Sequence, residues 1–354
     1  MQLSDNVTPV PSHVANRKIV DAVTLDFDRI PIIDLRPALE GDAEAFAKTA
    51  DQIREVCREV GFFYVKNHGI EEPVLDAALQ TTADFFHLPE SVKLQYDIGK
   101  IRRHRGYVPL GALSADPEQI DHQQGYEVGP ELPADDPEHL AGNCLYGPNV
   151  WPAEVAGFET AVYTYFEEAF ELGRTLFKLF ASALDLPLDY FEPHLTRPTA
   201  QLRLIYYPAL DPSLPAEKAT GIGAHTDYEC FTILRQTDPG LQVQNRAGQW
   251  IEAPPIPGTF VINIGDMFQR WTNDLFVSTP HRVISNTGRE RYSFPLFFGL
   301  NHATVVRCLD ACASTENPPR YPPTHFGHWI ETMHTYAYKY RWHERGKIPN
   351  PELV

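Results

Sequence analysis

The sequence predicts a mainly β protein in which one β core carries helices before and after it. From about residue 199, short β-branched and aromatic runs alternate with Gly, Pro, Asn and Asp, which is typical of a sandwich, barrel or jelly roll. Upstream of this point, apolar residues recur at helical spacing. The tail from about residue 324 to 345 is aromatic and His-rich, and it again predicts helix. The six predicted core strands cover residues 201–207, 231–235, 241–244, 259–264, 281–285 and 292–300.

The N-terminal third predicts mixed strand and helix. Residues 30–35, IPIIDL, form a short apolar run that favours an early strand. Helical spacing over residues 43–60 ends at Gly61, a common helix-stop residue. The run GFFYVKNHGI that follows predicts a strand entering a turn, and a second helix is expected over residues 73–86.

The middle of the chain changes character twice. Residues 98–150 are rich in Gly, Pro, Asp and His, which indicates loops and short strands of the kind that often cover a site. Residues 158–184 keep an apolar stripe and predict a long supporting helix. We therefore expect a lead-in (1–28), a mixed α/β region packed on the core (29–198), the core itself (199–305) and a C-terminal helical tail (306–354).

The charge of the chain limits its partners. It has 30 Lys and Arg against 47 Asp and Glu, a formal net charge of −17. An acidic surface repels phosphate backbones and anionic lipid, which argues against nucleic acid or a membrane as the main partner. Solubility is the simplest explanation of this acidity. A small-molecule substrate is the expected partner, and the oligomeric state is left open.

Cysteine content and hydropathy favour a reducing cytoplasm. The five cysteines are an odd and sparse set, so no disulfide framework is predicted. No apolar run reaches the roughly 18–20 residues that span a bilayer. The polar first 18 residues lack the apolar segment of a secretory signal.

The clearest chemical pattern is a pair of possible metal ligands, His225 and Asp227, in the run GAHTD. On a strand, residues two apart project to the same side. His281, which opens another β-branched run, is the candidate third ligand. Two imidazoles and one carboxylate leave three coordination positions free, as in the facial triad of non-haem iron oxygenases. A chance His-x-Asp pair and a zinc hydrolase are the alternatives.

A second pattern, Arg291-x-Ser293, lies in the apolar run RYSFPLFF. Both side chains share one face of a predicted strand, and a buried guanidinium needs an anionic partner. A dicarboxylate co-substrate would supply that partner, bound by Arg291 with help from the Ser293 hydroxyl. A structural salt bridge to a nearby Asp or Glu is the alternative.

These motifs together resemble the isopenicillin N synthase-like family of 2-oxoglutarate/iron(II)-dependent oxygenases. The His-x-Asp, His and Arg-x-Ser elements resemble those of the family in order and spacing. Four upstream segments add to the likeness, and the resemblance runs from about residue 29 to about residue 335. These segments are IPIIDL (30–35), GFFYVKNHGI (61–70), FFHLP (85–89) and GPNVWP (147–152).

The resemblance implies a distorted double-stranded β-helix, or jelly roll, with flanking helices. It implies that His225, Asp227 and His281 bind Fe(II), and that Tyr207 joins Arg291 and Ser293 around 2-oxoglutarate. With O2 as the other co-substrate, the enzyme would hydroxylate or desaturate a small organic molecule and release succinate and CO2.

The resemblance leaves rival functions open. Isopenicillin N synthase itself uses an Arg-x-Ser pair for a substrate carboxylate, so an oxidative cyclase that uses O2 without 2-oxoglutarate is one rival. A metal-dependent hydrolase and a non-catalytic binding protein of the same fold are the others.

Four residues are candidates for substrate binding. Arg105 and Tyr107 occupy a loop region that faces the iron in relatives, and Tyr228 and Phe298 are aromatic residues near the metal motifs. The alternatives are a solvated basic patch that includes Arg105, and ordinary core packing for the aromatic residues.

Overall fold

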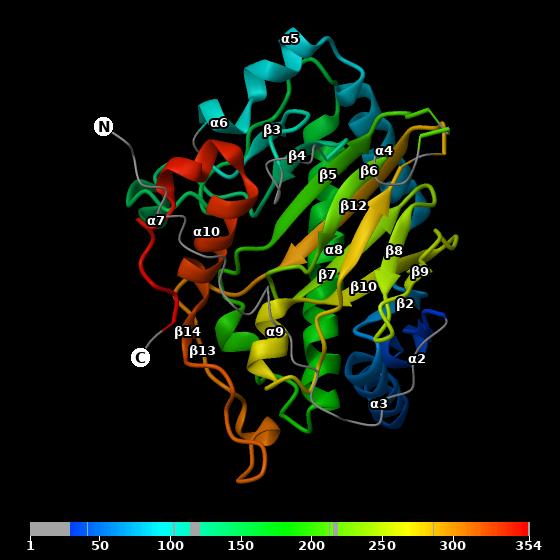
Figure 1. Ribbon diagram of the computed structural model, residues 1–354, viewed down its shortest axis with the longest axis vertical. Coiled ribbons are helices and arrows are strands. Elements are labelled where there is room, and N and C mark those ends of the chain that lie inside the picture. The colour runs from blue at the N-terminus through cyan, green and yellow to red at the C-terminus, as the bar shows by residue number, and fades with distance from the viewer. Residues whose placement is uncertain are drawn as a thin grey trace.

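The chain folds around two β-sheets that face each other. The computed structural model describes residues 29–352 except 41, 102, 114–120, 212, 215–218 and 286, so the expected lead-in (1–28) lies outside the described residues. The larger sheet has the strand order β1-β2-β10-β7-β12-β5-β4-β3, and the smaller one has the order β6-β11-β8-β9. Figure 1 shows the smaller sheet in front of the larger one. The predicted jelly-roll core with flanking helices is confirmed.

The strands of the larger sheet come from both halves of the chain. Its N-terminal members are β1 (Ile32–Asp34), β2 (Phe62–Lys66), β3 (Gly106–Val108) and β4 (Gln124–Val128). Its later members are β5 (Gln201–Tyr207), β7 (Phe231–Gln236), β10 (Thr259–Ile264) and β12 (Arg291–Phe298). The smaller sheet contains β6 (Thr220–His225), β8 (Leu241–Gln244), β9 (Trp250–Glu252) and β11 (His281–Ile284). All six predicted core strands are present, and β6 and β9 are additional.

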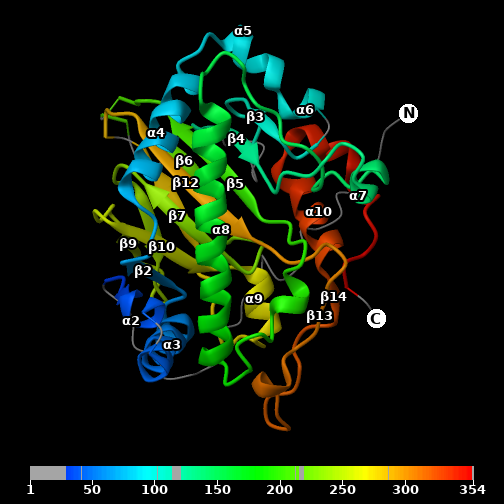
Figure 2. The ribbon, with the colours of Figure 1, turned by 180° about the vertical axis from the view of Figure 1, so that it is seen from behind.

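The helices lie mainly on the outer face of the larger sheet, as Figure 2 shows. The predicted helices correspond to α3 (Ala43–Glu59), α4 (Glu72–Phe86) and α8 (Phe158–Ala183). Shorter helices are α2 (Arg36–Leu39), α5 (Glu90–Lys93), η1 (Leu94–Tyr96), α6 (Ile98–Ile101), α7 (Pro137–Leu140), η2 (Glu192–His194) and α9 (Asp266–Trp271). None of the helices in the described part of the chain has the length and apolar character to cross a membrane.

The C-terminal region is less purely helical than expected. It contains α10 (Phe326–Ala337), η4 (Asp310–Cys312) and η5 (Lys339–Glu344), but also a small hairpin of β13 (Val305–Val306) and β14 (Thr324–His325). Such two-residue strands leave no periodic pattern in the sequence. Figure 1 shows α10 beside β3 and β4, at one end of the two sheets.

Strand alternation divides β12 between two environments. Arg291, Ser293, Pro295 and Phe297 line an internal cavity, while the residues between them pack against the helices. Because side chains alternate with period two, one strand serves both the core and the cavity. Its neighbour β5 does the same, since Gln201, Arg203, Ile205 and Tyr207 line the cavity.

Close packing of α8 on β12 gives a first prediction. A Cβ added at Gly173 would lie 2.2 Å from ring carbons of Phe298. We expect Gly173→Val to lower the free energy of unfolding by about 1–3 kcal/mol, because neither the helix nor the strand can withdraw. Urea unfolding measures the change. Glu171→Ala, at an exposed position of the same helix, is the control and should stay within about 0.5 kcal/mol of wild type. Equal stability of Gly173→Val and the control would contradict this packing.

Candidate active site

A cavity of about 650 Å³ lies between the two sheets. One wall is formed by the inward residues of β5 and β12, and the opposite wall by residues of β6, β8 and β11. The predicted metal ligands and the Arg-x-Ser pair open into this one cavity, although they belong to different sheets.

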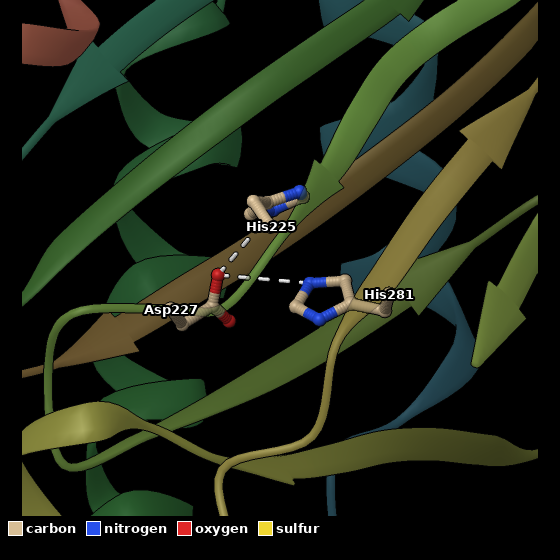
Figure 3. A group of neighbouring side chains, drawn as sticks. All are labelled: His225, Asp227 and His281. Carbon is tan, nitrogen blue, oxygen red and sulfur yellow. Dashed lines mark ion pairs between the residues drawn. The ribbon is translucent and has the colours of Figure 1, made fainter. Parts of the chain in front are cut away.

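His225, Asp227 and His281 form a compact cluster on one side of the cavity (Figure 3). His225 ends β6, His281 begins β11, and the two are direct partners across the antiparallel pair. The Nε2 atom of each imidazole lies 3.7 Å from Oδ1 of Asp227. One ligand atom from each residue lies within 4.8 Å of the other two, which suits a single metal ion.

Asp227 does not lie on the same strand as His225, contrary to the sequence prediction. Asp227 lies two residues beyond the end of β6, in the loop that follows the strand. Alternation along a strand therefore does not by itself place it. The loop turns the carboxylate back towards the two imidazoles, as Figure 3 shows.

Hydrogen bonds orient all three candidate ligands. Nδ1 of His225 lies 2.8 Å from the carbonyl oxygen of Gly223, and Nδ1 of His281 lies 3.2 Å from that of Thr279. Because these nitrogens face acceptors, we assign the ring protons to them, which leaves each Nε2 lone pair for a metal.

The Asp227 carboxylate is held from behind. Its Oδ2 accepts hydrogen bonds from Asn263 Nδ2 at 2.7 Å and from the Thr232 hydroxyl. Oδ1 therefore remains directed at the imidazoles. Sequence reasoning did not identify these two residues, although a polar Asn within the apolar run TFVINI was an available signal.

Burial and mutual charge set the protonation of the cluster. Burial and the neighbouring His281 lower the pKa of His225 to about 4, so this imidazole is neutral at pH 7. Burial alone would raise the pKa of Asp227, but the two histidines and the two hydrogen-bond donors bring it below its usual value. A neutral imidazole and an ionised carboxylate are the forms that bind metal.

One more acid faces the cavity near the cluster. Burial, together with the charge of Asp227, raises the pKa of Glu229 to about 8. At neutral pH the Glu229 carboxyl is therefore largely protonated and can donate a hydrogen bond.

Arg291 and Tyr207 are direct partners across β12 and β5, and the guanidinium lies 4.7 Å from the centre of the Tyr207 ring. Arg291 donates to the Asp238 carbonyl oxygen at 3.1 Å and to Gln236 Oε1 at 2.9 Å. Its Nη1 is buried and has no partner. The Ser293 hydroxyl donates to the Tyr207 hydroxyl at 3.3 Å.

The salt-bridge alternative for Arg291 is not seen among the described residues. The nearby Asp238 carboxylate instead faces exposed Arg289, at 3.5 Å. A buried guanidinium that keeps one nitrogen unpaired in a cavity suits an anionic ligand such as a carboxylate.

Only one of the four substrate-binding candidates, Tyr228, lines the cavity. The other three need correction. Arg105 is 2% exposed and donates to the backbone oxygens of His104 and Leu145, so it is neither a cavity residue nor part of a solvated patch. The Tyr107 hydroxyl is also turned away and donates to Gln124 Oε1 at 2.7 Å.

The prediction that Phe298 lines the substrate site is wrong by one position. It points into the aromatic core, 4.9 Å from the Phe170 ring centre, and its neighbour Phe297 lines the cavity instead. A shift of one residue along a strand moves a side chain to the opposite face.

Comparison with known proteins agrees with this geometry. Residues 30–154 match the family described as non-haem dioxygenase in morphine synthesis N-terminal, and residues 198–300 match the 2OG-Fe(II) oxygenase superfamily. The chain belongs to the 2OG-Fe(II) oxygenase superfamily. It is therefore an oxygenase that uses Fe(II), 2-oxoglutarate and O2, as the motifs predicted.

Relatives of this oxygenase are similar over most of their length. The 2-oxoglutarate-Fe(II) type oxidoreductase hxnY of Emericella nidulans is 35% identical over 318 residues, which cover 87% of this chain and 89% of the relative. Homoarginine-6-hydroxylase 2-ODD-233 of Oryza sativa is 34% identical over 304 residues, 81% of this chain and 90% of its own. A full-length Neurospora crassa protein, crystallised in complex with alpha-KG and thymine, has a TM-score of 0.76 and 31% identity, covering 85% of this chain and 95% of that one.

The hydrogen bond behind Asp227 gives a second prediction. We expect Asn263→Ala to weaken Fe(II) binding by about 10–100-fold, because the carboxylate loses the donor that fixes its orientation. Anaerobic equilibrium binding against a competing chelator measures this change.

Asn245→Ala is the matched control, since the Asn245 amide is also buried but bonds to Gln249 in the turn between β8 and β9. Iron affinities that agree between wild type and Asn263→Ala would show that the hydrogen bond does not support the site.

Proposed function

We propose that the oxygenase holds iron(II) with His225, Asp227 and His281 and binds the far carboxylate of 2-oxoglutarate with Arg291, Ser293 and Tyr207. One observation carries this assignment: the buried, unpaired Nη1 of Arg291 lies in the lining of the cavity that also contains the three metal ligands. The substrate is a small organic molecule that becomes hydroxylated or desaturated.

The chain contributes orientation and enclosure to this reaction. Arg291 and the two hydroxyl groups would fix one end of 2-oxoglutarate and so orient its other end towards His225, Asp227 and His281. When bound, iron(II) and 2-oxoglutarate supply the oxidising chemistry and yield succinate and CO2. The apolar side chains of Leu234, Leu241 and Val283 exclude water from the same part of the cavity.

Two rival functions make different predictions about the co-substrate. An oxidative cyclase of this fold would bind a substrate carboxylate at Arg291 and consume O2 without forming succinate. A metal-dependent hydrolase would work with zinc and consume no O2. Coupled measurement of O2 uptake and succinate release separates all three.

The names of the relatives do not define the substrate. One is named for homoarginine, an amino acid with several charges, and a structural neighbour was crystallised with thymine, a neutral ring. We infer a cytoplasmic location, which the five free cysteines of the chain support.

The third prediction tests the co-substrate site. We expect Arg291→Met to raise the 2-oxoglutarate concentration needed for half-saturation by about 10–100-fold, because one charge-assisted contact is lost. Anaerobic titration of the iron(II)-loaded protein follows this binding through the visible charge-transfer band of a chelated keto acid.

Arg289→Met is the control, because Arg289 is two residues away and its side chain is 69% exposed. If Arg291→Met bound 2-oxoglutarate as tightly as this control, Arg291 would not be the carboxylate ligand. Absence of the band in wild type at saturating 2-oxoglutarate would favour the cyclase or the hydrolase.

A further inference from the structure

The cavity lining follows the β12–β5 pair from one end to the other. Arg291 and Tyr207 stand at one end of the β12–β5 pair, and Phe297 and Gln201 are partners at the other. Because a strand rises about 3.4 Å per residue, six residues separate the two ends by roughly 20 Å. With 2-oxoglutarate at the Arg291 end, the other end is left for the substrate.

Arg203 is the charged residue of this second end. It lies on β5 and is the direct partner of Glu127 on β4. Its Nε donates to Glu127 Oε1 at 2.6 Å, and its Nη2 donates to the Tyr338 hydroxyl. That hydroxyl in turn donates to Glu127 Oε1 at 2.6 Å, which closes the network.

The network holds the Arg203 guanidinium in place, and the Glu127 carboxylate balances its positive charge. The Glu127 side chain is fully buried, whereas 15% of the Arg203 side chain is exposed, and Arg203 lines the cavity. The rings of Phe297 and Tyr338 have their centres 5.4 and 5.5 Å from the guanidinium carbon. A guanidinium has five N–H donors, and the contacts described use only Nε and one N–H of Nη2. Donors therefore remain for a ligand, but the positive charge is already balanced.

The rest of the lining does not favour an anionic substrate. Arg282, the third arginine in the described lining, lies 4.1 Å from the centre of the Trp250 ring and donates to Gln242. Asp121 adds a carboxylate to the same cavity. The lining also contains the amide of Gln123, whose Oε1 is buried without a partner and would accept an N–H.

We propose that Arg203 is a specificity-determining residue that receives a neutral carbonyl group of the substrate, as in an amide, lactam or imide, and that the compensated Arg203–Glu127 pair discriminates against carboxylates. This inference rests on the proposed function, because it assumes that 2-oxoglutarate occupies the Arg291 end. An amide, lactam or imide also carries the N–H that suits Gln123.

Matched probes test the charge preference directly. Equilibrium dialysis of the anaerobic protein loaded with iron(II) and 2-oxoglutarate compares benzamide with benzoate, and uracil with its 6-carboxylate. We expect the neutral member of each pair to bind about tenfold more tightly or better, because a carboxylate would meet an arginine whose charge is already balanced and would lie in the same cavity as Asp121. Equal or tighter binding of the carboxylates, or no binding of any probe, would overturn the inference.

Glu127→Gln is the decisive variant, since it keeps the shape of the side chain and removes its charge. The uncompensated Arg203 should then prefer the carboxylates by about tenfold, while 2-oxoglutarate affinity stays at the wild-type value. Tyr338→Phe removes two hydrogen bonds but no charge, so the neutral preference should persist. An unchanged preference in Glu127→Gln would contradict the proposal.

Controls separate this inference from the function on which it rests. Glu192→Gln breaks a comparable ion pair with Arg174 outside the cavity and should leave all probe affinities unchanged. Failure of wild type to bind 2-oxoglutarate would overturn the proposed function, whereas normal 2-oxoglutarate binding without charge discrimination would overturn only the role of Arg203. Should Glu127→Gln not fold, the wild-type comparison of matched probes decides.

Discussion

The pairing of β6 with β11 brings two imidazoles close together. Without a bound ligand, this contact adds little to the stability of the fold. His225 and His281 are cross-strand partners with ring centres 4.2 Å apart, and Asp227 is buried beside them. Burying three polar groups this closely is costly unless a ligand satisfies them. A divalent cation would be such a ligand, because it would accept a lone pair from each imidazole and balance the carboxylate. The backbone acceptors behind the imidazoles and the donors behind Asp227 keep the cluster arranged for it.

The second organising constraint is the alternation of side chains along β5 and β12. It directs every other side chain into the cavity. Each strand therefore lines the cavity with a row of side chains that runs from the Arg291–Tyr207 end to the Phe297–Gln201 end. The intervening residues pack under α8 and hold the strands rigid. If 2-oxoglutarate and substrate bind at these two ends as proposed, strand geometry sets the distance between them.

Sequence alone predicted the parts of the site that depend on local pattern. The metal ligands, the Arg-x-Ser pair and most strands were predicted because each leaves a short motif or a regular spacing. Thr232 and Asn263 were not predicted, because they are partners across β7 and β10. The register of two strands that are far apart in the sequence cannot be read from a local pattern. The choice of Phe298 over Phe297 has a different origin, because alternation from Arg291 and Ser293 already predicts that residue 297 shares their face.

Arg105 and Tyr107 show a different limit of the sequence. Both have side chains that usually signal a surface or a binding site, yet both are buried and bond to groups inside the protein, although Nε of Arg105 keeps no partner. Arg105 is enclosed by backbone carbonyl groups, and Tyr107 bonds to Gln124 on the adjacent strand. Residue type alone therefore showed that each side chain needs a hydrogen-bond partner, but it did not show that the partner lies inside the protein rather than on a substrate.

The distribution of the site along the chain explains how one chemistry can serve different substrates. The metal ligands and Arg291 all lie within residues 198–300, the part that matches the oxygenase superfamily. Tyr338, together with His334 and Ala337, reaches the cavity from the C-terminal tail, beyond both matched regions. A change in the tail would thus alter the proposed substrate end of the cavity without replacing any of the proposed metal ligands. Because the Tyr338 hydroxyl bonds to both Glu127 and Arg203, the tail helps to position this ion pair, while the charges themselves come from β4 and β5.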